Sequence, residues 1–147
     1  MIISHIRSAA KFKQPVLIVD DQTVALNIHK AVLKSLELNL KIVTMTSPVD
    51  TLNLAKKQVG LTITDFSMKE MGCMQLLQSI NYTNSAKPTP IIVITVLKDK
   101  ALHQQLLAAG AAAYLTKLVN SQELCNVAQF LLIKSKAFYT HKITSLN

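Results

Sequence analysis

Residues 61–68 read LTITDFSM, and the other segments of the chain are organised around them. Leu61–Thr64 is a short run with β-branched residues, typical of a strand, and it ends abruptly on the carboxylate of Asp65. A single acid after a strand is commonly only a turn residue or a helix cap. Polar groups also follow other strand-like segments of this chain, and the carboxyl ends of parallel strands lie at one edge of a sheet. Asp65 is therefore a candidate site residue.

Four further segments have the pattern of short strands, at residues 16–19, 41–45, 91–94 and 112–116. VLIV at 16–19 and IIVI at 91–94 are apolar throughout, which is typical of strands buried on both faces. Residues 41–45 alternate more and are expected near an edge. Polar side chains follow three of these four segments. Asp20 and Asp21 follow 16–19, Thr95 follows 91–94, and Lys117 follows 112–116.

Helical patterns alternate with the strands. Apolar residues recur at helical spacing in segments at 22–37, 47–60, around 74–80, 99–110 and from 120 onward. Ser47, Asp99 and Asn120 are expected N-caps, whereas 81–90 is expected to be a surface loop and residues from 135 show no clear pattern. Five strands alternating with five helices predict an α/β fold, a doubly wound five-stranded parallel sheet with helices on both faces.

Length and composition exclude several classes. The 147 residues suit one domain, half of them are apolar, and no apolar run is long enough to span a bilayer. We expect no signal peptide and no membrane insertion, and hence a cytoplasmic protein. Cys73 and Cys125 lack the spacing of a metal site, so both are expected to be buried free thiols.

The net charge of +8 is concentrated at the two ends of the chain. Residues 1–13 and residues 134–147 each hold three bases and no acid. Residues 14–133 hold ten bases and eight acids, so no basic stripe crosses the fold. Solvated basic ends are favoured over contact with an acidic partner, a membrane surface or nucleic acid.

The polar strand ends suggest a specific chemistry. Three carboxylates in one place repel one another, so either their pKa values rise or a cation binds among them, and Mg²⁺ is the cation that oxygen ligands favour. A carboxylate beside a metal can act as a nucleophile toward a phosphoryl group, with a hydroxyl and an ammonium neutralising its charge. Thr95 and Lys117 supply those groups. Each of these residues, considered alone, could also be explained by a structural role, as a helix cap or as an ordinary strand-end residue.

The chain resembles the receiver domains of two-component response regulators, in particular chemotaxis-regulator-like ones. The resemblance covers about residues 14–133 and rests on Asp20-Asp21, Asp65, Thr95, Tyr114 and Lys117. The spacings agree too, with 44 residues from Asp21 to Asp65, 30 to Thr95 and 22 more to Lys117. It implies a flavodoxin-like sheet with the strand order 2-1-3-4-5.

The resemblance also implies roles for the site residues. Asp65 would accept the phosphoryl group from a histidine kinase or phosphotransfer protein. Asp21, Asp65 and the backbone carbonyl of Ser67 would hold Mg²⁺, with Asp20 acting through a bound water.

The resemblance implies three further roles. Lys117 would contact the phosphoryl group, while Thr95 would hydrogen-bond to it and Tyr114 would turn inward in step. These movements would reshape the face made by the fourth helix, fifth strand and fifth helix, where a downstream protein target would bind.

Three positions depart from the family pattern. Leu118 follows Lys117 where the family often has a proline after a cis peptide bond, so a cis bond is not expected here. Lys69 stands where proline is common, and Met71 where an acid is frequent. Lys69 adds positive charge near the site and could change kinase recognition or phosphoryl lifetime.

The resulting interpretation is a stand-alone receiver that acts as a signalling module and not as an enzyme. It divides the chain into a basic N-terminal extension at 1–13, the receiver domain at 14–134 and a short basic tail at 135–147, with no output domain. The alternatives are a docking-only, unphosphorylated receiver and, less favoured, a basic protein that binds nucleic acid or a membrane surface.

Two enzyme classes fit poorly. An aspartate-dependent phosphatase needs two aspartates separated by one residue, whereas Asp20 and Asp21 are adjacent and Asp65 has no acid two positions on. A flavin- or dinucleotide-binding protein would need a glycine-rich phosphate loop, and the chain has three glycines in total.

Overall fold

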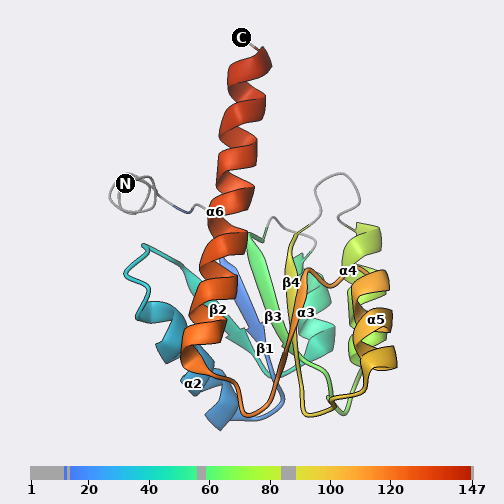
Figure 1. Ribbon diagram of the computed structural model, residues 1–147. Helices are drawn as coiled ribbons and strands as arrows, with labels where there is room; N and C mark the ends of the chain where they lie inside the picture. The colour runs from blue at the N-terminus through green and yellow to red at the C-terminus, as the bar shows by residue number, and fades with distance from the viewer. Residues whose placement is uncertain (1–11, 13, 56–58, 84–88, 147) are drawn as a thin grey trace.

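A computed structural model describes residue 12 and residues 14–55, 59–83 and 89–146. Five parallel strands form one sheet in the order β2-β1-β3-β4-β5, which confirms the predicted order (Figure 1). The strands are β1 (Val16–Val19), β2 (Ile42–Met45), β3 (Leu61–Asp65), β4 (Ile91–Thr95) and β5 (Ala113–Thr116). β1, β3 and β4 are buried along their whole length, as expected for interior strands whose two faces are both covered.

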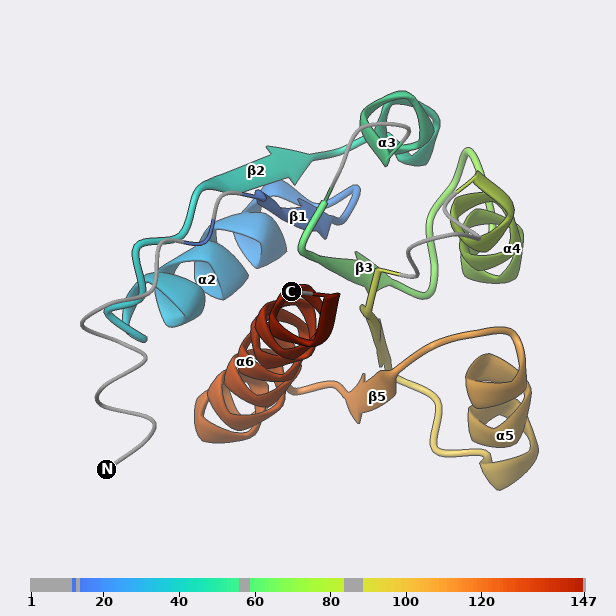
Figure 2. The same ribbon diagram turned by 90° about the horizontal axis from the view of Figure 1, so that it is seen from above.

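Helices cover both faces of the sheet (Figure 2). One face packs against α2 (Thr23–Lys34) and α6 (Ser121–Leu146), which contribute Leu26, Leu33, Leu124, Ala128 and Leu132 to its core. The other face packs against α3 (Pro48–Ala55), α4 (Cys73–Thr83) and α5 (Lys100–Ala108). This three-layer arrangement leaves the carboxyl ends of the strands uncovered by helices, and it is there that the polar strand-end residues lie.

The expected N-caps begin their helices. The Asp99 carboxylate accepts a hydrogen bond from the Ala101 N–H at 2.9 Å, at the start of α5. Asn120 accepts from the Glu123 N–H at 3.1 Å before α6, and Ser47 from the Asp50 N–H at 3.3 Å before α3. These side chains satisfy backbone donors that the first helical turn leaves unpaired.

The segment boundaries differ from the sequence prediction in a few places. The observed strands begin or end within one residue of the predicted ones, but α4 continues to Thr83, into the stretch expected to be a loop. α3 is described as far as Ala55, residues 56–58 lie outside the described residues, and Val59 is not helical, so the predicted helix end at Gly60 is too late. α6 continues to Leu146, through the stretch in which no pattern was evident, and its second half extends well beyond the sheet (Figure 1).

Among the residues that the structure describes, no helix combines the length and the apolar character that crossing a bilayer requires.

The peptide bond between Lys117 and Leu118 is cis. The expectation that this bond would not be cis, made because no proline follows Lys117, is therefore wrong. The general preference for trans describes a peptide bond apart from its surroundings. Here Lys117 is held by two contacts, because its N–H donates to the Thr95 carbonyl at 2.8 Å and its Nζ lies 2.7 Å from Asp65 Oδ1.

Candidate phosphoacceptor site

The strand register brings the polar strand ends together. Val19 of β1 lies beside Thr64 of β3, so Asp20 and Asp65 end neighbouring strands. Thr95 of β4 lies beside Thr116 of β5, which places Lys117 one residue past the same edge. One edge of the sheet thus gathers residues from four strands.

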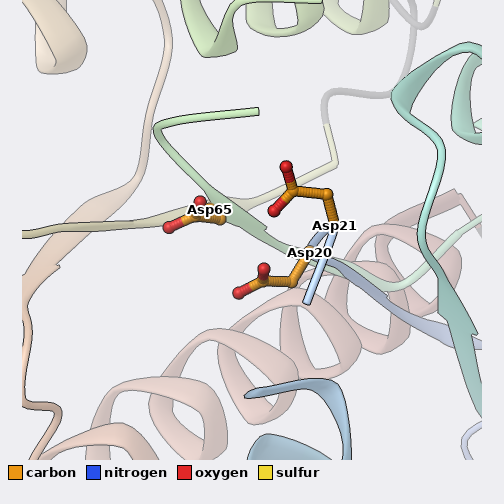
Figure 3. Close-up of side chains that lie close together, drawn as sticks. All are labelled: Asp20, Asp21 and Asp65. Atoms are coloured by element: carbon orange, nitrogen blue, oxygen red, sulfur yellow. The ribbon is translucent and has the colours of Figure 1, made fainter. Parts of the chain in front are cut away.

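Three carboxylates form an acidic cluster at this edge. Asp20, Asp21 and Asp65 each offer an oxygen, and these atoms all lie within 4.8 Å of one another (Figure 3). Asp20 and Asp65 are buried, with 2% and 5% of their surface exposed, while Asp21 is half-buried. Carboxylate oxygens at this separation are the donor set that Mg²⁺ prefers, so the residues present fit that ion.

Burial is the main influence on the pKa of Asp20. It raises the pKa of the Asp20 carboxyl above 3.8, and the nearby Asp65 and Asp21 raise the pKa further. The Gln22 N–H, which donates to Asp20 Oδ1 at 2.9 Å, and the Lys117 ammonium act in the opposite direction on this pKa. A divalent cation in the cluster would favour the ionised form of Asp20.

Lys117 is the cation that the chain itself brings to the cluster. Its Nζ lies 2.7 Å from Asp65 Oδ1, and its side chain is 29% exposed against 6% for Asp65. A short contact between a buried carboxylate and an ammonium that still reaches solvent leaves the positive charge available to an incoming anion. The geometry suits transfer of a phosphoryl group to Asp65.

Thr95 and Tyr114 make their side-chain contacts with other groups. Thr95 is 1% exposed, and its Oγ1 accepts a hydrogen bond from the Leu97 N–H at 3.0 Å. Tyr114 of β5 is half-buried and its ring stacks on that of His103 from α5. Their predicted parts in a conformational switch stay predictions.

The loop after Asp65 carries the remaining predicted residues. Ser67 and Lys69 are exposed, and the Ser67 carbonyl as a metal ligand stays a prediction. Glu70 accepts a hydrogen bond from the Ser47 hydroxyl at 2.9 Å, which ties this loop to the start of α3. Met71 is half-buried and packs against the core between the sheet and α3, α4 and α5.

The cysteines are free thiols, as expected. Cys73 is buried, whereas Cys125 is only half-buried. Burial raises the pKa of the Cys73 thiol to about 12, with a smaller contribution from the negative charge of Asp65. Cys73 is therefore a core residue and not a nucleophile at neutral pH.

Two histidines near the site were missed by the sequence analysis. His29 of α2 is 7% exposed; burial lowers its pKa, the charge of Lys117 lowers it further, and that of Asp65 raises it. His103 of α5 contacts both Tyr114 and the backbone of Leu97. A single histidine within an amphipathic helix gives no periodic signal, so only the packing of other elements identifies these two.

A doubly wound parallel sheet with an acidic cluster and a lysine at its carboxyl edge is the architecture of a receiver-type signalling module. The chain belongs to the response regulator receiver domain family, whose model matches residues 16–129. This family is a signalling module of two-component systems.

Two curated relatives match most of this chain. The cyclic di-GMP phosphodiesterase response regulator RpfG of Xanthomonas campestris pv. campestris is 29% identical over 110 residues, which are 74% of this chain and 29% of that protein. The two-component response regulator ARR21 of Arabidopsis thaliana is 26% identical over 132 residues, 88% of this chain and 21% of that protein. The chain thus spans less than a third of either relative.

Solved structures share the fold. The chemotaxis response regulator CheY4 of Vibrio cholerae superposes with a TM-score of 0.73 at 24% identity, covering 82% of this chain and all of that one (100%). The signal receiver domain of an HD domain-containing protein from Pseudomonas fluorescens Pf-5 gives 0.76 at 24% identity, covering 90% and 96%.

Proposed function

We propose that the protein accepts a phosphoryl group on Asp65 from a histidine kinase or phosphotransfer protein and signals through a changed protein-binding face. The observation that carries this proposal is the contact of Lys117 Nζ with Asp65 Oδ1 at 2.7 Å beside two further carboxylates. A structural ion pair has no need of the extra acids, because each adds repulsion. A phosphoacceptor with a metal needs all of them.

The transfer is a substitution at phosphorus. A carboxylate oxygen of Asp65 attacks the phosphorus of a phosphohistidine, the P–O bond forms as the P–N bond breaks, and the leaving imidazole takes up a proton from solvent. The Lys117 ammonium neutralises charge on the transferred oxygens. Asp21, Asp65 and the Ser67 carbonyl would hold a Mg²⁺ ion, with Asp20 acting through a water, and the ion would supply further positive charge.

The signal follows from the position of Thr95. Its hydroxyl, which accepts from Leu97 in the unphosphorylated protein, turns toward the phosphoryl group and donates to it. The loop after β4 then rearranges together with Tyr114, and the face formed by α5, β5 and α6 changes shape for a downstream protein target. In this proposal the protein is a signalling module located in the cytoplasm, and it assists only its own phosphorylation and dephosphorylation.

The test uses purified protein with acetyl phosphate and Mg²⁺, read by intact mass. We expect one added phosphoryl group in the wild type and in Asp50→Asn, which alters an exposed acid of α3. Asp65→Asn should gain none. Beryllofluoride with Mg²⁺ should raise the thermal midpoint of the wild type but not of Asp65→Asn. Full phosphorylation of Asp65→Asn would refute the proposal.

The second candidate is a docking-only receiver. One departure from the family pattern favours it: Lys69 is exposed in the loop after Asp65 and adds a positive charge there. The same experiment separates the two candidates, since a folded protein without mass gain and without stabilisation by beryllofluoride would be a receiver that only docks.

A further inference from the structure

Three contacts form a continuous path from Thr95 to Tyr114. The Leu97 N–H donates to Thr95 Oγ1 at 3.0 Å, and the Leu97 carbonyl lies 2.9 Å from His103 Nε2. The His103 ring stacks on the Tyr114 ring with 3.8 Å between centroids and 23° between planes. The path therefore runs through a single loop residue and a single histidine.

The chemistry of the path fixes one proton. A carbonyl oxygen can only accept, so His103 Nε2 carries a hydrogen and donates it to Leu97. The histidine is also held from its own helix, because its backbone N–H donates to the Asp99 carbonyl at 3.1 Å in the first turn of α5. The backbone of His103 is fixed in the helix and Nε2 is bound to Leu97, so the position of the ring follows the position of the Leu97 carbonyl.

We propose that His103 is a positioning residue that couples the hydroxyl of Thr95 to the ring of Tyr114. This inference rests on the proposed function, in which phosphorylation of Asp65 draws the Thr95 hydroxyl away from Leu97. The Leu97 N–H then loses its acceptor, the Leu97 carbonyl moves with the loop, and the hydrogen bond to His103 Nε2 is lost. The His103 ring then shifts, and Tyr114 loses the stacking partner that holds its side chain in the half-buried position.

Two substitutions at His103 separate its hydrogen bond to Leu97 from its stacking on Tyr114. His103→Phe keeps a flat ring that can stack on Tyr114 but has no N–H for the Leu97 carbonyl. His103→Gln keeps an N–H donor but has no ring. A histidine with only a packing role would be replaced adequately by Phe, whereas a coupling residue needs both properties.

The readout is the fluorine NMR signal of Tyr114. Tyr82→Phe and Tyr139→Phe leave Tyr114 as the only one of the three tyrosines, so incorporated fluorotyrosine reports on it alone. The protein with this background and with His103 unchanged should show a change in the chemical shift of the Tyr114 signal on addition of beryllofluoride and Mg²⁺. In both His103 variants the shift should be reduced about fivefold or more. The starting signal should stay near the wild-type position in His103→Phe and move to an unstacked position in His103→Gln.

Controls keep the inference distinct from the proposed function. Gln104→Phe adds a ring to the exposed side of the same helix and should respond like the wild type. Phosphorylation of Asp65 by acetyl phosphate should be unchanged in both His103 variants, because His103 does not contact the acidic cluster. An undiminished Tyr114 shift in both variants would overturn the inference alone. Absence of phosphorylation and of any shift in the wild type would overturn the proposed function and this inference with it.

Discussion

Lys117 Nζ lies 2.7 Å from one oxygen of Asp65, while the carboxylates of Asp20 and Asp21 belong to the same cluster. In this cluster one ammonium group therefore balances three carboxylates. Burial is the main cause of the raised pKa of Asp20, and the negative charges of Asp65 and Asp21 raise this pKa further. An added cation should consequently stabilise the folded protein, and most strongly when Lys117 is absent.

The first prediction concerns Lys117→Met. Without its ammonium, the buried Asp65 carboxylate loses its charged partner, and the free energy of unfolding without metal should fall by about 1–3 kcal/mol. Mg²⁺ should raise the thermal midpoint more in this variant than in the wild type, although phosphorylation slows. Lys98→Met, at an exposed position after β4, should behave like the wild type. Equal Mg²⁺ stabilisation in all three proteins would contradict the prediction.

The acids, Thr95 and Lys117 could be found from the sequence because each one interrupts or follows an apolar run at a strand end. His103 could not, because its significance lies in the carbonyl of Leu97 and the ring of Tyr114, which come from a loop and a strand outside its own helix. The exposed Leu118 could be noted as a departure, but the cis bond before it could not be predicted from residue type.

At the scale of elements, α5 links the site to the proposed signalling face. Asp99 begins this helix with a side-chain cap, and three residues separate that cap from His103. The orientation of the first turn of α5 therefore determines where the His103 ring lies.

The second prediction is that Asp99→Ala lowers the free energy of unfolding by about 1 kcal/mol, the usual cost of losing an N-cap. The Ala101 amide, which donates to Asp99 at 2.9 Å, should also exchange its hydrogen faster. Chemical denaturation and hydrogen-exchange NMR measure these effects. Lys98→Ala, one residue before the helix cap, should leave both quantities unchanged, and a similar loss in that variant would argue against a capping effect.

Helix starts were easier to predict than helix ends. Ser47, Asp99 and Asn120 are residue types that accept backbone hydrogen bonds, so their positions are readable in the sequence. The ends depend on packing and on helix propensity summed over many residues, and α4 and α6 accordingly continue past the points where the apolar pattern fades.

At the scale of the whole molecule, the face of the sheet that α2 and α6 cover buries an ionisable side chain. The core shared by α2 and α6 contains a buried histidine, His29, which is 7% exposed. Burial and, to a smaller extent, the charge of Lys117 lower the pKa of this imidazole below 6.5, against the influence of Asp65. The folded protein therefore holds His29 neutral at a pH where the unfolded chain already binds a proton.

The third prediction follows from this linkage. Because the unfolded state binds more protons just below pH 6.5, the free energy of unfolding should be fully retained above that pH and should fall as pH decreases toward the folded-state pKa. His29→Leu should flatten this slope. Denaturant titrations across the pH range measure the effect, and above about pH 7.5, where both states are neutral, the difference between the two proteins should be constant. Identical slopes below pH 6.5 would exclude His29 as the cause.

The order of the strands along the chain has a consequence during protein synthesis. Asp20 and Asp21 follow β1 and Asp65 ends β3, whereas Lys117 follows β5. As the chain leaves the ribosome, the acids emerge well before the cation that balances them. A nascent or truncated chain without β5 thus has three acids and not the ammonium of Lys117 to balance them, so under the proposed function competence for phosphorylation is gained only when the final strand joins the sheet.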